Sequence, residues 1–126
     1  MYTDLLTRIK NAQLARLESV KAPYSSMDMA IAELLAARGY IGDAQKKGRL
    51  PKRIIEIKLK YTDGGGAITG IRFLSKPSRR RYFGWRDLRP VKQGYGMLVI
   101  STPKGMMAST EAKKQKLGGE ALFEIW

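Results

Sequence analysis

The sequence predicts an α+β fold, with two helices and a short sheet in residues 1–74 and mainly strands with one short helix in residues 75–126. Apolar residues recur at helical spacing in two segments of the first half. Residues 55–61 instead alternate apolar and charged side chains, as a half-buried strand does. Composition changes at residues 75–78, which mark the boundary between two small lobes, a size that 126 residues allow.

The first helix is expected over residues 4–17, where apolar side chains recur every three or four positions and polar side chains occupy the other faces. A second helix is expected to begin at Ser25, because Asp28 follows three positions later in a box-like arrangement. It is expected to end at Gly39, since glycine commonly follows the last helical turn. The apolar positions of the two helices are Leu5, Leu6, Ile9, Ala12, Met27, Ile31, Leu34 and Leu35.

Strands are expected on both sides of the second helix. Residues 20–24 predict a short strand or an extended connection, because a proline disfavours the helical conformation in the residue before it. Residues 45–53 are expected to form a basic loop that leads into the alternating segment at 55–61. Three glycines at 64–66 indicate a turn, so residues 68–74 are expected to return as the second strand of a hairpin.

The second half is expected to be mainly β. Strands are predicted at residues 97–100 and 121–126, with a short helix at about 109–116 between them. A Gly-Gly pair at 118–119 ends this helix and turns the chain into the last strand.

Charge is the strongest signal in the composition. The chain has 24 Lys and Arg residues against 11 Asp and Glu residues, which gives a formal charge of +13. An excess of this size indicates a polyanionic partner, nucleic acid first among them, against the alternative of a merely soluble basic protein. The absence of Cys and His excludes disulfides, zinc fingers and histidine-dependent catalysis.

The location expected from the sequence is the cytoplasm. No apolar run approaches the roughly 18 residues that span a bilayer. The N-terminal residues lack the basic and apolar regions of a secretory signal. A membrane partner is therefore not expected.

A basic segment at residues 72–92 carries aromatic side chains, Tyr82, Phe83 and Trp85. Cations neutralise phosphates and aromatic rings stack on unpaired bases, so this mixture suits single-stranded or irregular RNA. The alternatives are a solvated charged face for the arginines and a core position for at least one of Tyr82 and Phe83, because adjacent strand residues point to opposite sides. The basic residues of the segment are Arg72, Lys76, Arg79, Arg80, Arg81, Arg86, Arg89 and Lys92, and Asp87 is its acid.

The segment that follows the strand at 97–100 is expected to form a type I turn, with proline at its second position and Gly105 at its fourth. The turn is expected to project the hydroxyls of Ser101 and Thr102 together with the ammonium of Lys104. The helix near Ser109 then begins with unpaired N–H groups, which attract anions. Alone, these residues also fit an ordinary strand-to-turn junction. Together with the basic segment, they indicate contact with RNA.

An ordered set of short motifs runs through the chain and is densest from residue 75 onward. The motifs are Thr7-Arg8-Ile9-Lys10-Asn11-Ala12, Ser75-Lys76-Pro77, Arg79-Arg80, Tyr82, Gly94-Tyr95-Gly96, Ser101-Thr102-Pro103-Lys104-Gly105, Glu111-Ala112, Gly118-Gly119-Glu120 and Trp126. In this order they resemble the signatures of the bacterial-type small-subunit ribosomal protein eight family. The resemblance covers nearly the whole chain.

The resemblance implies two lobes packed together in a ribosomal protein without catalytic residues or a cofactor. It implies primary binding to the central domain of the small-subunit (16S) ribosomal RNA, at an irregular helix, and a part in subunit assembly. Neighbouring small-subunit proteins are expected partners. Because some family members repress their own translation, the messenger RNA of the chain's own operon is a further candidate partner.

The resemblance also assigns RNA-binding residues. The primary contacts that it implies are Tyr82, Ser101, Thr102, Lys104, Gly105, Gly119 and Glu120. The basic segment and the turn add Lys76, Arg79, Arg80 and Pro103 to the expected site. The secondary contacts, on the first helix, are Thr7, Arg8 and Asn11. Glu120 is expected to be held by a basic side chain or by backbone N–H groups. The chain departs from the family at Pro103 and Ser78, where serine and glycine are usual, and at 115–117, where Gln-Lys-Leu replaces Leu-Gly-Val.

Two other classes of protein are possible alternatives on composition. An RNA-processing enzyme would have to use carboxylates such as Glu111, Glu120 and Glu124, which do not have metal-ligand spacing. A DNA-architectural protein would need a helix-turn-helix or a long basic arm, and neither pattern is present.

Overall fold

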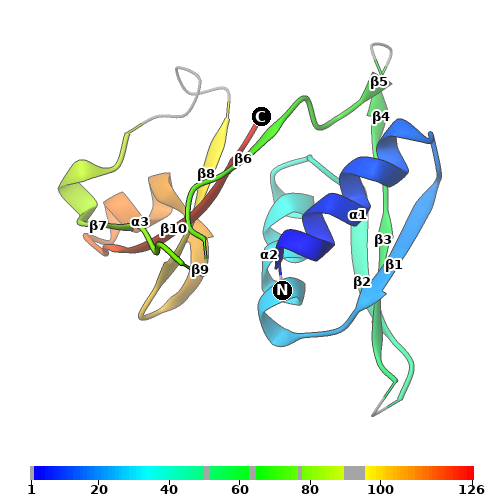
Figure 1. The fold of residues 1–126 in the computed structure, drawn as a ribbon, viewed down its shortest axis with the longest axis horizontal. Coiled ribbons are helices and arrows are strands. Elements are labelled where there is room, and N and C mark those ends of the chain that lie inside the picture. Colours follow the sequence, from blue (N-terminus) through cyan, green and yellow to red (C-terminus); the bar gives the residue numbers. More distant parts are fainter. Residues whose placement is uncertain (1, 50–51, 63–64, 77, 90–95) are drawn as a thin grey trace. The chain divides into compact units, whose positions relative to one another are not determined.

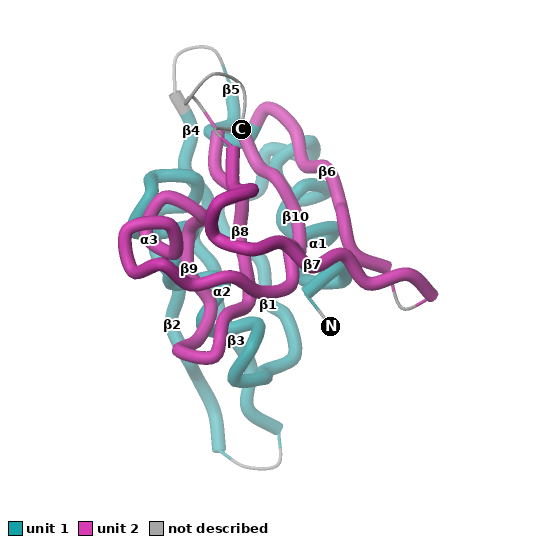
Figure 2. The backbone as a smooth tube through the Cα atoms, turned by 90° about the vertical axis from the view of Figure 1, so that its left-hand side faces the viewer, with its two compact units in different colours: residues 1–68 teal, residues 69–126 magenta. Residues whose placement is uncertain are grey.

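The computed structural model describes residues 2–49, 52–62, 65–76, 78–89 and 96–126 and has an α+β fold, as predicted (Figure 1). The chain divides into two compact units, residues 1–68 and 69–126, coloured separately in Figure 2. The two units divide before the strand at residues 71–73, so this strand belongs to the second unit. The boundary suggested by the sequence, after residue 74, would have left it in the first. No described helix has the length and apolar character needed to cross a membrane.

Unit 1 (residues 1–68) combines two helices with a three-stranded antiparallel sheet in the order β1-β3-β2. A separate pair of two-residue strands, β4 and β5, follows this sheet. The elements are α1 (Tyr2–Leu14), β1 (Ser19–Pro23), α2 (Ser26–Ala37), β2 (Asp43–Lys47), β3 (Ile54–Lys58), β4 (Tyr61–Thr62) and β5 (Gly65–Gly66).

Both predicted helices are confirmed, and the reasons are local. The Ser25 hydroxyl caps α2 by accepting the N–H of Asp28 at 3.1 Å. Gly39 follows the helix in the left-handed region, at φ +81°, where glycine is favoured. α1 ends at Leu14, three residues before the expected end at 17, and Arg16 takes a left-handed conformation at φ 57°.

Two predictions about strands in unit 1 are wrong. The first three residues of the expected basic loop, 45–47, belong to strand β2. β2 is an edge strand and is almost wholly exposed, so its sequence shows no alternation of apolar and polar side chains. The expected hairpin between residues 55–61 and 68–74 does not form. β3 instead lies between β1 and β2, with Ile55 and Ile57 fully buried.

Unit 2 (residues 69–126) is a five-stranded antiparallel sheet with the path β6-β10-β8-β9 and with β7 also paired to β10. The elements are β6 (Ile71–Phe73), β7 (Tyr82–Phe83), the 3-10 helix η1 (Trp85–Asp87), β8 (Met97–Thr102), β9 (Gly105–Ala108), α3 (Ser109–Lys114) and β10 (Gly119–Ile125). The predicted strands at 97–100 and 121–126 and the short helix between them are confirmed. β7 and β9 were not predicted.

One face of this sheet carries an apolar cluster. Its buried members come from β8, β10, α3 and the segment after η1, and Phe83 and Trp85 pack against them. The buried members are Leu88, Leu98, Ile100, Ala112 and Ala121. This face of the sheet is therefore fixed by packing, and the alternate side chains of β8 must point the other way.

A β-bulge divides β10 into two halves. Ala121 pairs with Ile100 and Phe123 pairs with Val99, which leaves Leu122 as an extra residue. The bulge changes which side chains share a face: Glu120 is opposite Ser101, but Glu124 is opposite Leu98. Since Ser101 and Leu98 are an odd number of positions apart on β8, the two glutamates lie on opposite faces of the sheet.

Candidate nucleic-acid interface

Four side chains from four neighbouring strands form one line across the sheet of unit 2. Glu120 on β10 pairs with Tyr82 on β7 and with Ser101 on β8, and Ser101 pairs with Met106 on β9. Directly opposed residues of antiparallel strands present their side chains on the same face. This cross-strand row (Tyr82, Glu120, Ser101 and Met106) lies on the face opposite to the apolar cluster.

The row combines an exposed ring with polar groups. The Tyr82 side chain is 69% exposed, so its ring faces solvent. Ser101 and Met106 are half-buried. A hydroxyl both donates and accepts hydrogen bonds, and a phenol ring offers an apolar face with a polar end. Met106 was not predicted, because only the register of β8 and β9 places it beside Ser101.

Glu120 is held by an arginine, as expected. Arg80 donates from Nη1 to both carboxylate oxygens of Glu120, at 3.2 Å and 3.4 Å. The Glu120 side chain is only 14% exposed and the Arg80 side chain 48%. A half-exposed pair of this kind contributes at most about 1 kcal/mol to stability. Its effect is to fix the carboxylate beside Tyr82 and Ser101, and this orientation matters more than the energy.

The Gly-Gly pair before Glu120 allows three strands to approach closely. A Cβ on Gly119 would collide with the carbonyl oxygen of Ser101 on β8. A Cβ on Gly118 would lie 2.6 Å from the carbonyl oxygen of Phe83 on β7. Only residues without a side chain fit here, so the two glycines set the spacing of the strands that carry the row.

The turn after β8 differs from the prediction in one respect. The Thr102 hydroxyl does not project beside that of Ser101. It donates to the carbonyl of Gly105 at 2.9 Å and accepts the N–H of Lys104 at 3.2 Å, closing the turn between β8 and β9. The cause is the alternation of a strand, because neighbouring residues must point to opposite faces. Pro103, Lys104 and Gly105 lie exposed at this turn.

A basic arm, which the structure describes at residues 75–76 and 78–81, connects β6 with β7, and both of these strands pair with β10. Ser75 is buried, and its hydroxyl donates to the carbonyl of Ala121 at 2.7 Å and accepts the N–H of Arg81 at 2.9 Å. Farther out, Lys76 and Arg79 exchange backbone hydrogen bonds at 3.0 Å and 2.9 Å. The arm therefore holds exposed cations on a defined base, directly before β7, which begins at Tyr82.

The aromatic pair after the arm is divided between the two faces, as the sequence indicated. Tyr82 is exposed in the cross-strand row, whereas Phe83 packs against the apolar cluster. The Arg81 guanidinium lies over the Phe83 ring, 5.6 Å from its centroid. Arg80 and Arg81 thus serve different faces, because one pairs with Glu120 and the other covers Phe83.

The residues expected to make a secondary contact share one exposed face of α1 in unit 1. Thr7, Arg8 and Asn11 are all exposed. The Thr7 hydroxyl donates to the carbonyl of Thr3 at 2.7 Å, and Arg8 pairs with Asp4 at 3.0 Å. Thr7 and Arg8 therefore already use part of their hydrogen-bonding capacity within the helix.

The carboxylates that an enzyme would need are not brought together. Glu120 and Glu124 lie on opposite faces of the sheet, and Glu111 accepts a hydrogen bond from Gln115 at 2.8 Å. Among the residues that the structure describes, no group of three acidic residues could hold a metal ion. The fold and the site define a basic binding protein built on an α+β scaffold.

Comparison with known proteins identifies the family. Residues 1–126 match the family described as ribosomal protein S8. Proteins named small ribosomal subunit protein uS8 are similar over 98% of this chain and 94% of their own length. They include relatives from Nitratidesulfovibrio vulgaris (42% identical over 123 residues), Rubrobacter xylanophilus (42% over 124) and Roseiflexus castenholzii (44% over 124). The chain belongs to the ribosomal protein S8 family, whose members are structural and not enzymatic.

Proposed function

We propose that this chain is a structural protein of the small ribosomal subunit that binds the central domain of 16S ribosomal RNA through the cross-strand row and the basic arm. The family supports a ribosomal role, and the relatives are named as small-subunit proteins. The observation that carries the RNA site is the register that aligns Tyr82, Glu120 and Ser101 on the face opposite to the apolar cluster.

The chemistry of the row suits an irregular RNA helix. Bases that are unpaired or splayed in an internal loop can stack on the Tyr82 ring and hydrogen-bond with the Ser101 hydroxyl. The Glu120 carboxylate accepts hydrogen bonds only, so it favours amino groups on base edges over phosphates. Lys76 and Arg79 on the arm and Lys104 at the turn neutralise the flanking phosphates. In this proposal the groups that contact bases and the groups that contact phosphates belong to the same site.

The secondary contact is assigned to α1, through Thr7, Arg8 and Asn11. These side chains share an exposed helical face with one cation, which suits a weaker contact to RNA phosphates and sugars. As a primary binder of the central domain, the protein would order its RNA early in assembly of the small subunit, in the cytoplasm. A messenger RNA of its operon that reproduces the same internal loop would compete for the cross-strand row.

Chemical footprinting of the central-domain RNA with the full chain tests the proposal. Protection of one irregular helix at nanomolar to micromolar protein is the expected result. Uniform protection along the RNA, or none, would overturn the proposed site. Competition by the operon messenger RNA in the same assay distinguishes a repressor from a protein that binds only ribosomal RNA.

A matched pair of variants assigns the binding face. Glu120→Gln and Glu124→Gln make the same chemical change on the same strand, but on opposite faces of the sheet. Glu120→Gln is expected to weaken RNA binding by about 1.5–3 kcal/mol, as for a hydrogen bond to a charged group. Glu124→Gln should bind as the parent does. Equal effects of the two variants would exclude the cross-strand row as the reading surface.

A further inference from the structure

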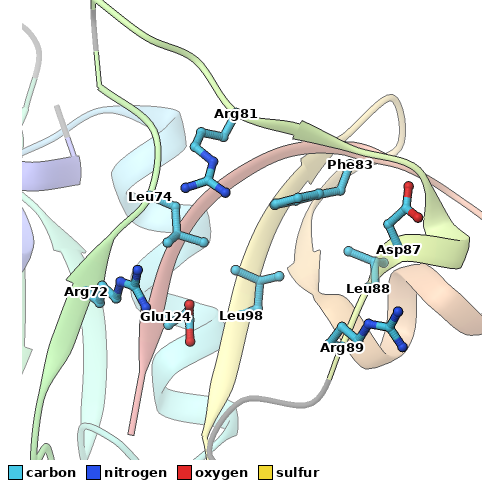
Figure 3. Close-up of a pocket in the computed structure, with 9 residues that line it drawn as sticks. All are labelled: Arg72, Leu74, Arg81, Phe83, Asp87, Leu88, Arg89, Leu98 and Glu124. Carbon is cyan, nitrogen blue, oxygen red and sulfur yellow. The ribbon is translucent and has the colours of Figure 1, made fainter.

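Unit 2 has a second charged surface, on the face of the sheet that carries the apolar cluster. A pocket of about 270 Å³ lies between β6, β7 and η1, and Figure 3 shows the residues that line it. Leu98 and Glu124 line it, and these two are paired across β8 and β10. The pocket is therefore on the opposite face from Ser101 and Glu120, and no residue of the cross-strand row contributes to it.

The floor of this pocket is apolar and its rim carries arginines. Leu74, Leu88 and Leu98 form the floor, and Leu88 and Leu98 are buried. Arg72, Arg81 and Arg89 surround it, and all three are exposed. We name this site the arginine-rimmed pocket.

The guanidinium groups at the rim are available to form a salt bridge with a ligand. Arg72 is directly opposite Glu124 in the register of β6 and β10. Even so, within the described parts of the chain, the salt bridges are Arg8–Asp4, Lys47–Glu56 and Arg80–Glu120, and no rim arginine takes part in one. Guanidinium groups outside any salt bridge, set around an apolar floor, match a ligand that brings its own carboxylate next to an apolar group.

The apolar floor of the pocket decides between RNA and protein as the occupant. A phosphodiester group has no apolar part to lie on the three leucines, whereas a protein segment can place an apolar side chain there and a carboxylate on the rim arginines. The one aromatic ring in its lining, Phe83, already lies beneath the Arg81 guanidinium and so offers less of its face to a base. An apolar centre with arginines and mixed charges at the rim is instead the pattern of a protein interface.

We propose that the arginine-rimmed pocket binds an acidic segment of a neighbouring protein of the small subunit. One apolar side chain would lie on the leucine floor and an adjacent carboxylate would bind the rim arginines. The volume is suitable, because a cavity of about 150 Å³ already holds a benzene ring. The identity of the partner as a subunit protein rests on the proposed function. The protein would then join RNA on one face of its sheet and protein on the other.

Site-directed cross-linking tests this directly, since the sequence has no Cys and a single introduced thiol is unique. Arg89→Cys is labelled with a benzophenone and assembled into small subunits, and the cross-linked species are mapped by mass spectrometry. The expected product is one peptide of another subunit protein that contains an acidic residue beside an apolar one. Cross-links to RNA alone, or no cross-link at all, would overturn the proposal. Tyr82→Cys, labelled in the same way on the opposite face, should cross-link to RNA and not to that peptide.

Charge-reversal variants then distinguish the contribution of the pocket to peptide binding from that of the net charge of the chain. The mapped peptide is synthesised with a fluorophore and titrated with the full chain. Arg72→Glu with Arg89→Glu is expected to weaken binding at least tenfold. The control, Arg86→Glu with Lys116→Glu, makes the same charge change around Trp85 outside the pocket and should change binding less than threefold. Equal losses in the two double variants would show that only net charge matters.

The same two double variants keep this proposal distinct from the RNA-binding function. Their affinities for the central-domain RNA should be equal to each other, because neither set touches the cross-strand row or the basic arm. If the parent chain does not bind this RNA, the proposed function fails whatever the peptide does. If RNA binds but the peptide titration shows no preference for the pocket, the pocket proposal fails alone.

Discussion

The buried hydroxyl of Ser75 donates to the carbonyl of Ala121 and so fastens the basic arm to the bulge of β10. It also accepts the N–H of Arg81, which closes the base of the arm. Ser75→Ala leaves both backbone groups without this partner, so we expect a loss of about 1–3 kcal/mol in the free energy of unfolding. RNA affinity should fall as well, because the arm loses its fixed base. Chemical denaturation and RNA titration measure the two losses. Ser78→Ala, farther along the arm, is the control and should change stability by less than about 0.5 kcal/mol.

The hydroxyls at the end of β8 should behave differently from each other. Ser101→Ala is expected to weaken RNA binding without a change in stability, because Ser101 is opposite Glu120 in the row where we propose that RNA binds. Thr102→Val should lower stability by about 1–3 kcal/mol, since its hydroxyl closes the turn from the opposite face. Pro103→Ser should alter RNA affinity only a few-fold. A new hydroxyl contributes about 0.5–1.5 kcal/mol, while the lost rigidity of proline costs about 0.4–1 kcal/mol. A silent Ser101→Ala variant beside a tenfold loss in Pro103→Ser would reverse this assignment.

Gly119→Ala should be poorly tolerated. The added Cβ collides with the backbone of Ser101, and backbone yields less readily than a side chain, so we expect a loss of about 1–3 kcal/mol or more. Separation of β10 from β8 would also displace Glu120 from Ser101 and reduce RNA affinity. Gly84→Ala is the matched control. Gly84 has an ordinary φ of −74°, and its Cβ would meet only the Asp87 carboxylate at 3.5 Å. Thermal unfolding measures the stability of both variants. Equal losses of stability in Gly119→Ala and Gly84→Ala would contradict this account.

Neutralising cations should have unequal effects in the two units. We expect Arg79→Gln with Arg80→Gln to lower RNA affinity more than Lys46→Gln with Lys47→Gln, although both change the net charge equally. Arg79 is exposed on the arm and Arg80 holds Glu120 in the cross-strand row, whereas Lys47 pairs with Glu56 at 2.8 Å and Lys46 lies over the Tyr24 ring at 5.5 Å, both away from the proposed site. For every phosphate that is no longer neutralised, the slope of log affinity against log salt should become shallower by about 0.7–0.9. Equal affinities and slopes for the two double variants would argue against the arm as part of the primary site.

One carboxyl in unit 1 should give stability a defined pH dependence. The hydrogen bond from the Lys47 ammonium holds the pKa of Glu56 below its usual value of 4.5. Because the folded state has the lower pKa, the stabilisation is present above the pKa of the unfolded chain and is lost as the pH falls through the folded value. Glu56→Gln should therefore be less stable than the parent at pH 7, and the difference should disappear in acid, once the pH is below the folded-state pKa. Urea denaturation at several pH values checks this, and a difference that persists in acid would rule out the ionic origin.

The features predicted correctly from the sequence are those fixed by near neighbours in the chain. The cap at Ser25 and the stop at Gly39 each depend on residues within one helical turn, and both are confirmed. β2 was not predicted because an exposed edge strand does not require alternating apolar and polar side chains. The failed hairpin has a related cause: the partner of residues 71–73 is β10, at the far end of unit 2, and pairing at that distance leaves no local pattern.

The candidate site shows the same limit more sharply. The residues alone connected Ser101 with the basic segment that holds Tyr82, and only the resemblance to a family added Glu120 to this set. Their alignment depends on the register of three strands, which periodicity does not reveal. The bulge is equally hidden, because Ala121, Leu122 and Phe123 are all apolar and contain no glycine or proline to mark it.

The extra residue in β10 also anchors the entry of the basic arm. Removing Leu122 would leave Phe123 opposite Val99 and Glu124 opposite Leu98, so each side chain would stay on its present face of the sheet. The deletion would instead remove the carbonyl of Leu122, which accepts the N–H groups of Leu74 and Ser75 at 3.0 Å and 3.5 Å. Unit 2 would then keep the side chains of both faces, but the chain entering the arm would lose this backbone anchor.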